Sequence, residues 1–168
     1  MIRKKILLLF AVFITSLSVL HAQKLFYEVI AHVDTAYRTV DVSTKINIPS
    51  ELKIPGDTVW FHLWANAFSN TRNEFTEEQL KHGLTSFYFR DQNKLSEIND
   101  IKVTVQQNPA SYVFKDDSNE ILGVIVGSQN TFAGNITIEY KLKLPALVNG
   151  LGYEKGNFYL GNFYPKLA

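Results

Sequence analysis

Apolar and polar residues alternate along several stretches of the chain, which is the pattern that half-buried β-strands produce. The alternation is most regular over residues 136–144, where isoleucine, tyrosine or leucine occupies every second position. Residues 39–48 alternate in the same way, and residues 25–34 do so less regularly. A short connection joins these last two stretches, so we expect an antiparallel hairpin. Pro49 and Pro145 end two of the stretches, because proline cannot donate to a strand ladder.

The stretch of residues 59–68 is the most aromatic part of the chain and predicts a further strand, which ends in a polar turn. It holds both tryptophans of the protein. Residues of equal parity share one face of a strand, so we expect Trp60, His62 and Trp64 to point one way. Bulky groups on both faces predict a strand in the middle of a sheet, covered on both sides. We expect this stretch to supply the structural core with Trp60, Phe61, Leu63, Trp64 and Asn66.

Shorter stretches complete the predicted sheet, at residues 101–105, 111–114, 121–126 and 157–164. The third of these is apolar throughout except for Gly123, which indicates either a strand buried on both faces or a β-bulge at the glycine. Short strands separated by frequent turn signals indicate an all-β fold. We expect an antiparallel β-sandwich or a saddle-like curved sheet.

One helix is predicted between the strands. The residues from Thr76 to Gln79 match a capping box, in which the Thr76 hydroxyl accepts from the Gln79 backbone N–H and the Gln79 side chain reaches back. Gly83 is typical of the residue that follows a helix. The sequence therefore predicts one short helix over residues 76–82, which needs the sheet to hold it because isolated helices of this length are unstable.

The first 22 residues have the pattern of a signal peptide. Three basic residues, Arg3, Lys4 and Lys5, precede an apolar run over residues 6–20, and Ala22 supplies a small residue at the cleavage site. The alternative is a membrane anchor, but the run is short against the roughly 20 residues that cross a bilayer. We expect a signal peptide at residues 1–22, one domain at residues 23–168, an exported product in the periplasm or outside the cell, and no membrane association after cleavage.

Composition narrows the classes of function. The 168 residues include no cysteine, which excludes disulfides, thiol catalysis and cysteine-ligated metal. Hydrophobic residues make up 46% of the chain and charged residues 20%, so a packed domain is expected rather than a disordered one. Residues 1–22 hold three of the 17 basic residues and none of the 16 acidic ones, which leaves a net charge of −2 on the remainder. No basic patch predicts a nucleic-acid partner.

No catalytic or metal-binding pattern emerges from the sequence. The four histidines are His21, His32, His62 and His82, and none is followed by glutamate or by a second histidine four residues later. A zinc site of the H-E-x-x-H type therefore cannot form in this chain, because that spacing places both histidines on one helix face. We interpret His62 as a hydrogen-bonded core residue, with a ligand as the alternative. Residues 116–120 are rich in acids but lack the glycine and spacing of a calcium loop.

Several segments together resemble one family. They are the run F-H-L-W-A-N-A-F at residues 61–68, Asn70, Thr71, Arg72, Gln79, the aromatic triplet at residues 87–89, and the closing run L-G-N-F-Y-P-K at residues 160–166. This combination resembles the amino-terminal β-domain of aminopeptidase N-like zinc metallopeptidases, in the form secreted by Bacteroidetes-type bacteria. The resemblance extends over most of residues 25–168.

The resemblance implies a non-catalytic domain of an exported enzyme that removes amino-terminal residues from peptides. The zinc would be held by a catalytic domain that this chain lacks, and the partners would be that domain and a peptide substrate. Asn162 is the nearest match to the residue that grips the substrate's free amino group, where other members usually carry glutamine; the alternative is a turn or edge residue. The run that ends at Ala168 is expected to be incomplete, as in an amino-terminal fragment or a truncated gene product.

A second function class stays open. The chain would then be a stand-alone secreted β-sandwich that binds a protein, a peptide or a glycan. Its binding surface would be formed by exposed aromatic side chains near the end of the chain. The candidates are Tyr153, Phe158, Tyr159, Phe163 and Tyr164.

Overall fold

The all-β prediction is confirmed by a computed structural model, which describes residues 25–128 and 131–168. The predicted signal peptide at residues 1–22 lies outside the described residues. The larger sheet has five strands in the order β1 (Phe26–Asp34), β2 (Thr39–Ile48), β8 (Gly134–Lys143), β4 (Glu97–Val105) and β5 (Asn108–Pro109). All of its neighbouring strands are antiparallel.

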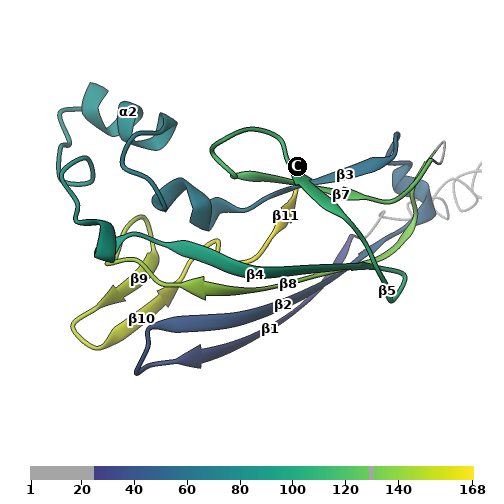
Figure 1. Ribbon diagram of the computed structural model, residues 1–168, viewed down its shortest axis with the longest axis horizontal. Helices are drawn as coiled ribbons and strands as arrows, with labels where there is room; N and C mark the ends of the chain where they lie inside the picture. The colour runs from purple at the N-terminus through teal and green to yellow at the C-terminus, as the bar shows by residue number, and fades with distance from the viewer. Residues whose placement is uncertain (1–24, 129–130) are drawn as a thin grey trace, which may run out of the picture.

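A smaller sheet faces the larger one (Figure 1). Its order is β11 (Lys166–Leu167), β3 (Thr58–His62), β7 (Ile121–Ile125) and β6 (Tyr112–Phe114). A separate hairpin pairs β9 (Leu151–Glu154) with β10 (Asn157–Leu160). The helical segments are η2 (Ser50–Leu52), η3 (Trp64–Phe68), α2 (Glu74–Lys81) and η4 (Gln92–Lys94). The architecture is an open, sandwich-like pair of antiparallel sheets with one α-helix among the described residues.

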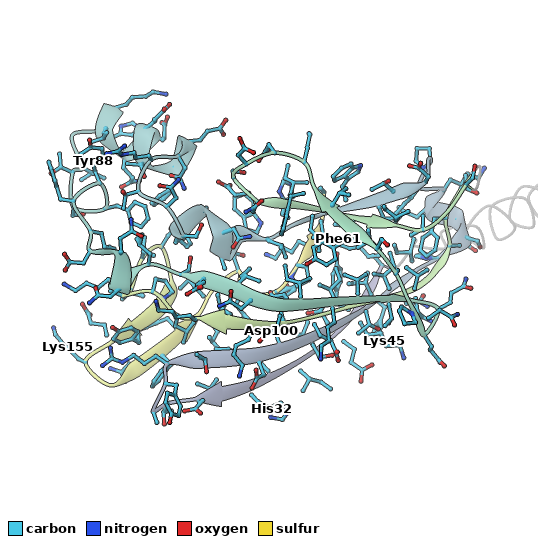
Figure 2. All side chains as sticks on the ribbon, viewed as in Figure 1. His32, Lys45, Phe61, Tyr88, Asp100 and Lys155 are labelled. Carbon is cyan, nitrogen blue, oxygen red and sulfur yellow. The ribbon has the colours of Figure 1, made fainter. Side chains whose placement is uncertain are left out.

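The hydrophobic core lies between the two sheets. Strand β2 matches its predicted bounds and points its predicted apolar face inward, with Val40, Ile46 and Ile48 almost fully buried. In β8, Ile136, Ile138 and Leu142 fill the same layer, as the alternation predicts. Phe61 reaches this layer from β3 (Figure 2) and is fully buried. The side chains of both sheets therefore share one core.

The aromatic stretch departs from the prediction after His62. The strand ends there, and Trp64–Phe68 form a 3₁₀ turn in which the Asn66 N–H donates to the Leu63 carbonyl at 2.9 Å. Phe61, Leu63 and Asn66 are buried as predicted, but Trp64 is 43% exposed and Trp60 is half-buried. The prediction that Trp64 belongs to the core is therefore wrong, because the face that it shares with Trp60 and His62 is partly exposed, while Val59 and Phe61 point into the core.

The α-helix begins two residues earlier than predicted, and a different residue caps it. Asn73 is the N-cap, and its Oδ1 accepts from the Thr76 N–H at 3.0 Å. The Thr76 hydroxyl donates to the same oxygen and is buried. Asn73 in turn donates from Nδ2 to the Ala67 carbonyl at 2.6 Å, which fixes the cap against η3. The predicted capping box at Thr76 is wrong because Asn73 already occupies that role.

Of the two predicted alternatives at Gly123, the structure has a strand buried on both faces, since Leu122, Gly123 and Val124 are all buried. The register between β3 and β7 is continuous across Gly123, so no bulge forms. A Cβ at this position would lie 2.6 Å from Trp60 Cζ3, because the indole covers the glycine. One face of β7 is thus covered by a side chain of the neighbouring strand. Elsewhere, a register shift does occur in β4, between Asn99 and Lys102.

Candidate functional site

A polar groove opens where β3 passes into η3. Its volume is about 990 Å³, and three segments of the chain form its walls. The first is the end of β3 with the turn after it, the second is the start of α2, and the third is the loop before β7. The side chains that matter for its chemistry are His62, Trp64, Arg72, Glu74, Glu77, Asp116, Asp117 and Glu120.

Two aromatic rings stack on the wall of this groove. The centroids of His62 and Trp64 are 5.2 Å apart, and the rings are inclined by 23°. His62 therefore shares a surface with Trp64, as the sequence predicts, although that surface is partly exposed rather than buried in the core. An exposed indole beside an imidazole offers a flat face for stacking or for a cation.

Backbone carbonyls and asparagine amides hold the polar groove in shape. Asn66 donates from Nδ2 to the Asn119 carbonyl at 2.6 Å, which ties η3 to the loop before β7. The Leu63 N–H donates to the Glu120 carbonyl at 2.7 Å in the same place. These contacts join segments more than 50 residues apart. Asn66, which belongs to the run at residues 61–68, therefore links η3 to the loop before β7.

The groove carries mainly negative charge. Burial, followed by the charges of Glu74 and Asp116, raises the pKa of the Glu120 carboxyl above its ordinary value. The pKa of Asp116 is lowered, because its carboxylate accepts hydrogen bonds from the Ser118 side chain and backbone. Arg72 adds a positive charge to the rim. The arrangement favours polar or cationic groups over anions.

The described residues do not fit a zinc ion. Within residues 25–128 and 131–168, no three histidine, cysteine, aspartate or glutamate side chains gather closely enough to hold a metal. His82 instead contacts Glu78 at 3.1 Å on the surface of α2. His32 lies on β1, and His62 stacks on Trp64. We therefore derive no chemical step through a metal in this part of the chain.

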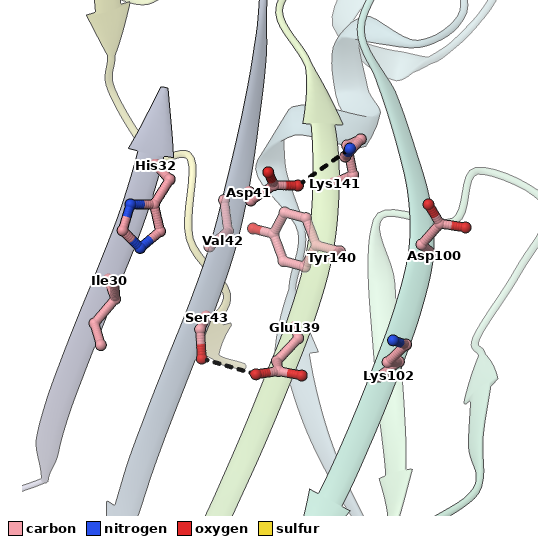
Figure 3. A pocket seen from close by; sticks show the side chains of 10 residues that line it. All are labelled: Ile30, His32, Asp41, Val42, Ser43, Asp100, Lys102, Glu139, Tyr140 and Lys141. Atoms are coloured by element: carbon pink, nitrogen blue, oxygen red, sulfur yellow. Dashed lines mark hydrogen bonds and ion pairs between the residues drawn. The ribbon is translucent and has the colours of Figure 1, made fainter. Parts of the chain in front are cut away.

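The outer face of the five-stranded sheet has a second, shallower hollow of about 490 Å³ (Figure 3). Ion pairs and hydrogen bonds join polar side chains of neighbouring strands on this face. Lys141 Nζ lies 3.5 Å from Asp41 Oδ1, and the Ser43 hydroxyl donates to Glu139 at 3.3 Å. Such exposed pairs contribute little energy, and their charges offset one another. This face is a solvated sheet surface without an evident chemical role.

Asn162 lies apart from both hollows, in the turn between β10 and β11. It is exposed, has a φ of 52°, and accepts from Lys166 Nζ through Oδ1 at 2.7 Å. A positive φ is common for asparagine in turns. Asn162 does not line the polar groove, although its partner Lys166 pairs with His62 across the sheet, and its predicted contact with a substrate amine stays a prediction.

The aromatic side chains named for the binding-module alternative differ in exposure. Tyr159 is exposed, whereas Tyr153, Phe158, Phe163 and Tyr164 pack partly against the core. In the polar groove, Trp64 is an exposed ring that sequence reasoning placed in the core, because both faces of its strand were expected to be covered.

A comparison with models of known protein families finds no match for this chain, and a search of the curated proteins finds none either. The resemblance to the aminopeptidase N-like domain therefore stays a prediction. No helix in the described part of the chain is both long enough and apolar enough to cross a membrane.

Proposed function

We propose that this chain is the non-catalytic amino-terminal domain of an exported zinc-dependent aminopeptidase. The observation that supports this most directly is the pairing of β11 with β3. It aligns Lys166 with His62 and Leu167 with Phe61. The two segments that most resemble the family, about 100 residues apart in sequence, are thus neighbours in one sheet. If each segment resembled the family only by chance, the two segments would have no reason to be neighbours in the fold.

In this proposal the domain acts as a scaffold and restricts access to the active site of the parent enzyme. The zinc and its ligands belong to a catalytic domain, which supplies the metal-activated water for hydrolysis. This chain supplies binding surface only, and Asn162 is the candidate for contact with the substrate's amino group. Asn162 Oδ1 already accepts from Lys166 Nζ at 2.7 Å, and its second lone pair is the acceptor left for that amino group.

The first test is the mass of the native protein, detected in the producing cells and their medium with an antibody raised against residues 23–168. A species several times heavier than this segment supports the proposal. That species should then release amino-terminal residues from peptides, lose this activity with a chelator, and regain it with zinc. A native species of the size of residues 23–168 alone would overturn the proposal.

The exposed Trp64 surface favours a second candidate, a secreted binding module. The stacked His62 and Trp64 rings beside the carboxylates of the polar groove suit a peptide or a glycan. A stand-alone module should be monomeric and unfold cooperatively without zinc. Self-association of the chain, with a broad unfolding transition, would argue against this candidate.

A further inference from the structure

Strand β1 forms one edge of the larger sheet (Figure 1). Among the described residues, no strand pairs with its outer side. Its nine residues pair with β2 without a register shift, so this edge is long and regular. An edge of this kind is a template for a further strand.

The edges of the two sheets at β5 and β6 are protected against such pairing. Strand β5 has two residues, one of which is Pro109, and its neighbour β4 carries a register shift. Strand β6 has three residues. Strand β1 has neither proline nor lysine, and Phe26, Ile30 and Val33 are exposed on it. Because proline, lysine, bulges and short length are the usual protection of an edge, their absence from β1 indicates an edge that pairs.

Alternate residues of β1 direct their backbone N–H and C=O groups to this edge. The Leu144 N–H donates to the Arg38 carbonyl at 2.9 Å, so Arg38 and every second residue after it in β2 face β8. Val42 is one of these residues. Ala31 lies opposite Val42 and therefore directs its own backbone groups away from β2. All odd-numbered residues of β1 share this orientation, so an added antiparallel strand must hydrogen-bond to them.

Symmetry and charge together select one register for a second copy of β1. In a two-fold symmetric antiparallel pair, one residue lies opposite its own copy at the axis. An axis at Ile30 pairs odd-numbered residues with each other and places Glu28 opposite His32 in both halves. Moving the axis one residue later would place Glu28 opposite Asp34, which is repulsive. Moving it one residue earlier would place Glu28 and His32 opposite apolar side chains.

The charges of β2 extend this match on the outer face of the sheet. Glu28 lies opposite Lys45 of β2, and His32 lies opposite Asp41. Asp41 in turn contacts Lys141 of β8 at 3.5 Å (Figure 3). With the axis at Ile30, acidic and basic side chains therefore alternate across the junction of two copies. An imidazole can donate a hydrogen bond to a carboxylate whether or not it is charged.

We propose that the protein forms a two-fold symmetric dimer in which β1 pairs antiparallel with β1 of a second copy, centred on Ile30. The two larger sheets then join into one. Main-chain hydrogen bonds connect Tyr27 with Val33 of the second copy. They also connect Val29 with Ala31 of the second copy, and each of these pairs occurs twice. The dimer goes beyond the proposed aminopeptidase function and is compatible with it, whereas it contradicts the second candidate, which requires a monomer.

Disulfide crosslinking tests the register, and the protein suits this experiment because it has no cysteine. Ile30→Cys places two thiols at the axis, in a pair whose Cα atoms are about 4.5 Å apart, within the range that a disulfide spans. Phe26→Cys, on the same face of β1, is the control, because its own copy would lie about 26 Å away. The protein without its predicted signal peptide is incubated with oxidised glutathione. The linked dimer should form about tenfold faster from Ile30→Cys, because its thiols are held together. Equal rates would overturn the inference.

The sign of the charge at residue 32 tests the match with Glu28. Sedimentation equilibrium measures the dimer Kd of the unaltered protein, His32→Lys and His32→Glu. His32→Lys should lower Kd and His32→Glu should raise it, so that the two variants differ about tenfold, with the unaltered protein between them. A purely structural role of His32 would not reverse with the sign of the charge. Equal Kd values, the opposite order, or a monomer at every concentration would overturn the inference.

A pair of proline variants tests the main-chain bonds. Ala31→Pro removes a donor that faces the open edge, where proline is tolerated because β2 does not use that donor. It should raise the dimer Kd about tenfold, because the lost bond occurs twice. Tyr112→Pro, in the edge strand β6 of the smaller sheet, is the control and should leave Kd unchanged. An unchanged Kd in a folded Ala31→Pro would overturn the inference. If Ala31→Pro does not fold, crosslinking and the two variants of residue 32 decide, because Ile30 and His32 are exposed.

Discussion

In the five-stranded sheet, buried and exposed residues alternate along whole strands, whereas in the segment from β3 to η3 the alternation ends where the strand gives way to a turn. In β2 and β8, every second side chain faces the core over ten residues, and the register runs unbroken from Thr39 opposite Lys143 to Ile48 opposite Gly134. In the β3–η3 segment the alternation lasts from Thr58 to His62 and then gives way to a 3₁₀ turn.

The difference arises from what each segment pairs with. Strands β2 and β8 pair with each other along their whole length, so the ladder holds the backbone extended. Beyond His62 the backbone loses its strand neighbours, and the Leu63 N–H makes its bond to the Glu120 carbonyl instead. Local turn bonds then fix the chain, and Trp64 stacks on His62 at the surface.

The largest effect is expected from a pair of substitutions within this segment. Phe61→Ala should destabilise the protein by about 3–5 kcal/mol, because it opens a cavity at a fully buried position. Trp64→Ala should cost less, about 1–2 kcal/mol, although the side chain is larger, because the indole is 43% exposed and its removal opens no closed cavity. Urea unfolding followed by circular dichroism measures both. Equal losses would mean that Trp64 belongs to the core after all.

The next largest effect is expected where β3 and β7 touch. Gly123→Ala would bring a Cβ to 2.6 Å from Trp60 and 2.8 Å from the Thr58 methyl group. Overpacking of this kind costs about 1–3 kcal/mol. Chemical denaturation of Gly123→Ala, Trp60→Ala and the double variant forms a double-mutant cycle. The substitution should cost less without the indole, and a cost independent of residue 60 would contradict the contact.

The five-stranded sheet and the β3–η3 segment also show how much of the fold the sequence could predict. The bounds of β2 and the inward face of β8 followed from periodicity, because full-length pairing preserves it. Asn73 as the helix cap was missed, because its choice over Thr76 depends on the bond from Asn73 to Ala67. Strand β11 has two residues and no periodicity, so nothing local signals it.

The candidate site was less predictable than the fold. His62, Trp64 and Asn66 lie within a stretch that the sequence singled out, but the groove also needs the loop at residues 116–120. That loop reaches the site through the pairing of β3 with β7, which brings together residues about 60 positions apart. Contacts of this range leave no local pattern. Asn162 came from the resemblance alone, and it lies outside the polar groove.

A gain in stability is expected in the large sheet, where one polar residue interrupts the apolar face of β2. Thr44 is fully buried, and its hydroxyl oxygen has no hydrogen-bond partner among the described residues. Thr44→Val keeps the shape and removes a desolvated polar group, which should stabilise the protein by about 1–2 kcal/mol. The urea midpoint should rise at constant slope. Thr137→Val, on a position of β8 that faces the other way, is the control and should change stability little. A loss of stability in Thr44→Val would reveal a partner for the hydroxyl.

The smallest effect concerns Tyr140, whose hydroxyl donates to the Phe163 carbonyl from within the core. Burial raises the pKa of Tyr140 well above its ordinary value. The phenol is protonated in both states below pH of about 10, where the unfolded group titrates. Above that pH the unfolded chain releases the proton first, so stability falls as pH rises towards the folded pKa.

Tyr140→Phe should therefore lower the stability at neutral pH and reduce the loss of stability at alkaline pH. At pH 7 it should cost about 0.5–1.5 kcal/mol, the usual contribution of one hydrogen bond. Above pH 10 the variant should lose stability less steeply than the parent, and part of the slope should remain because burial also raises the pKa of Tyr27. Tyr37→Phe, at an exposed position, is the control and should leave both quantities unchanged. Urea unfolding at several pH values measures the effect, and parallel alkaline slopes for Tyr140→Phe and the parent would show that this phenol ionises freely in the folded protein.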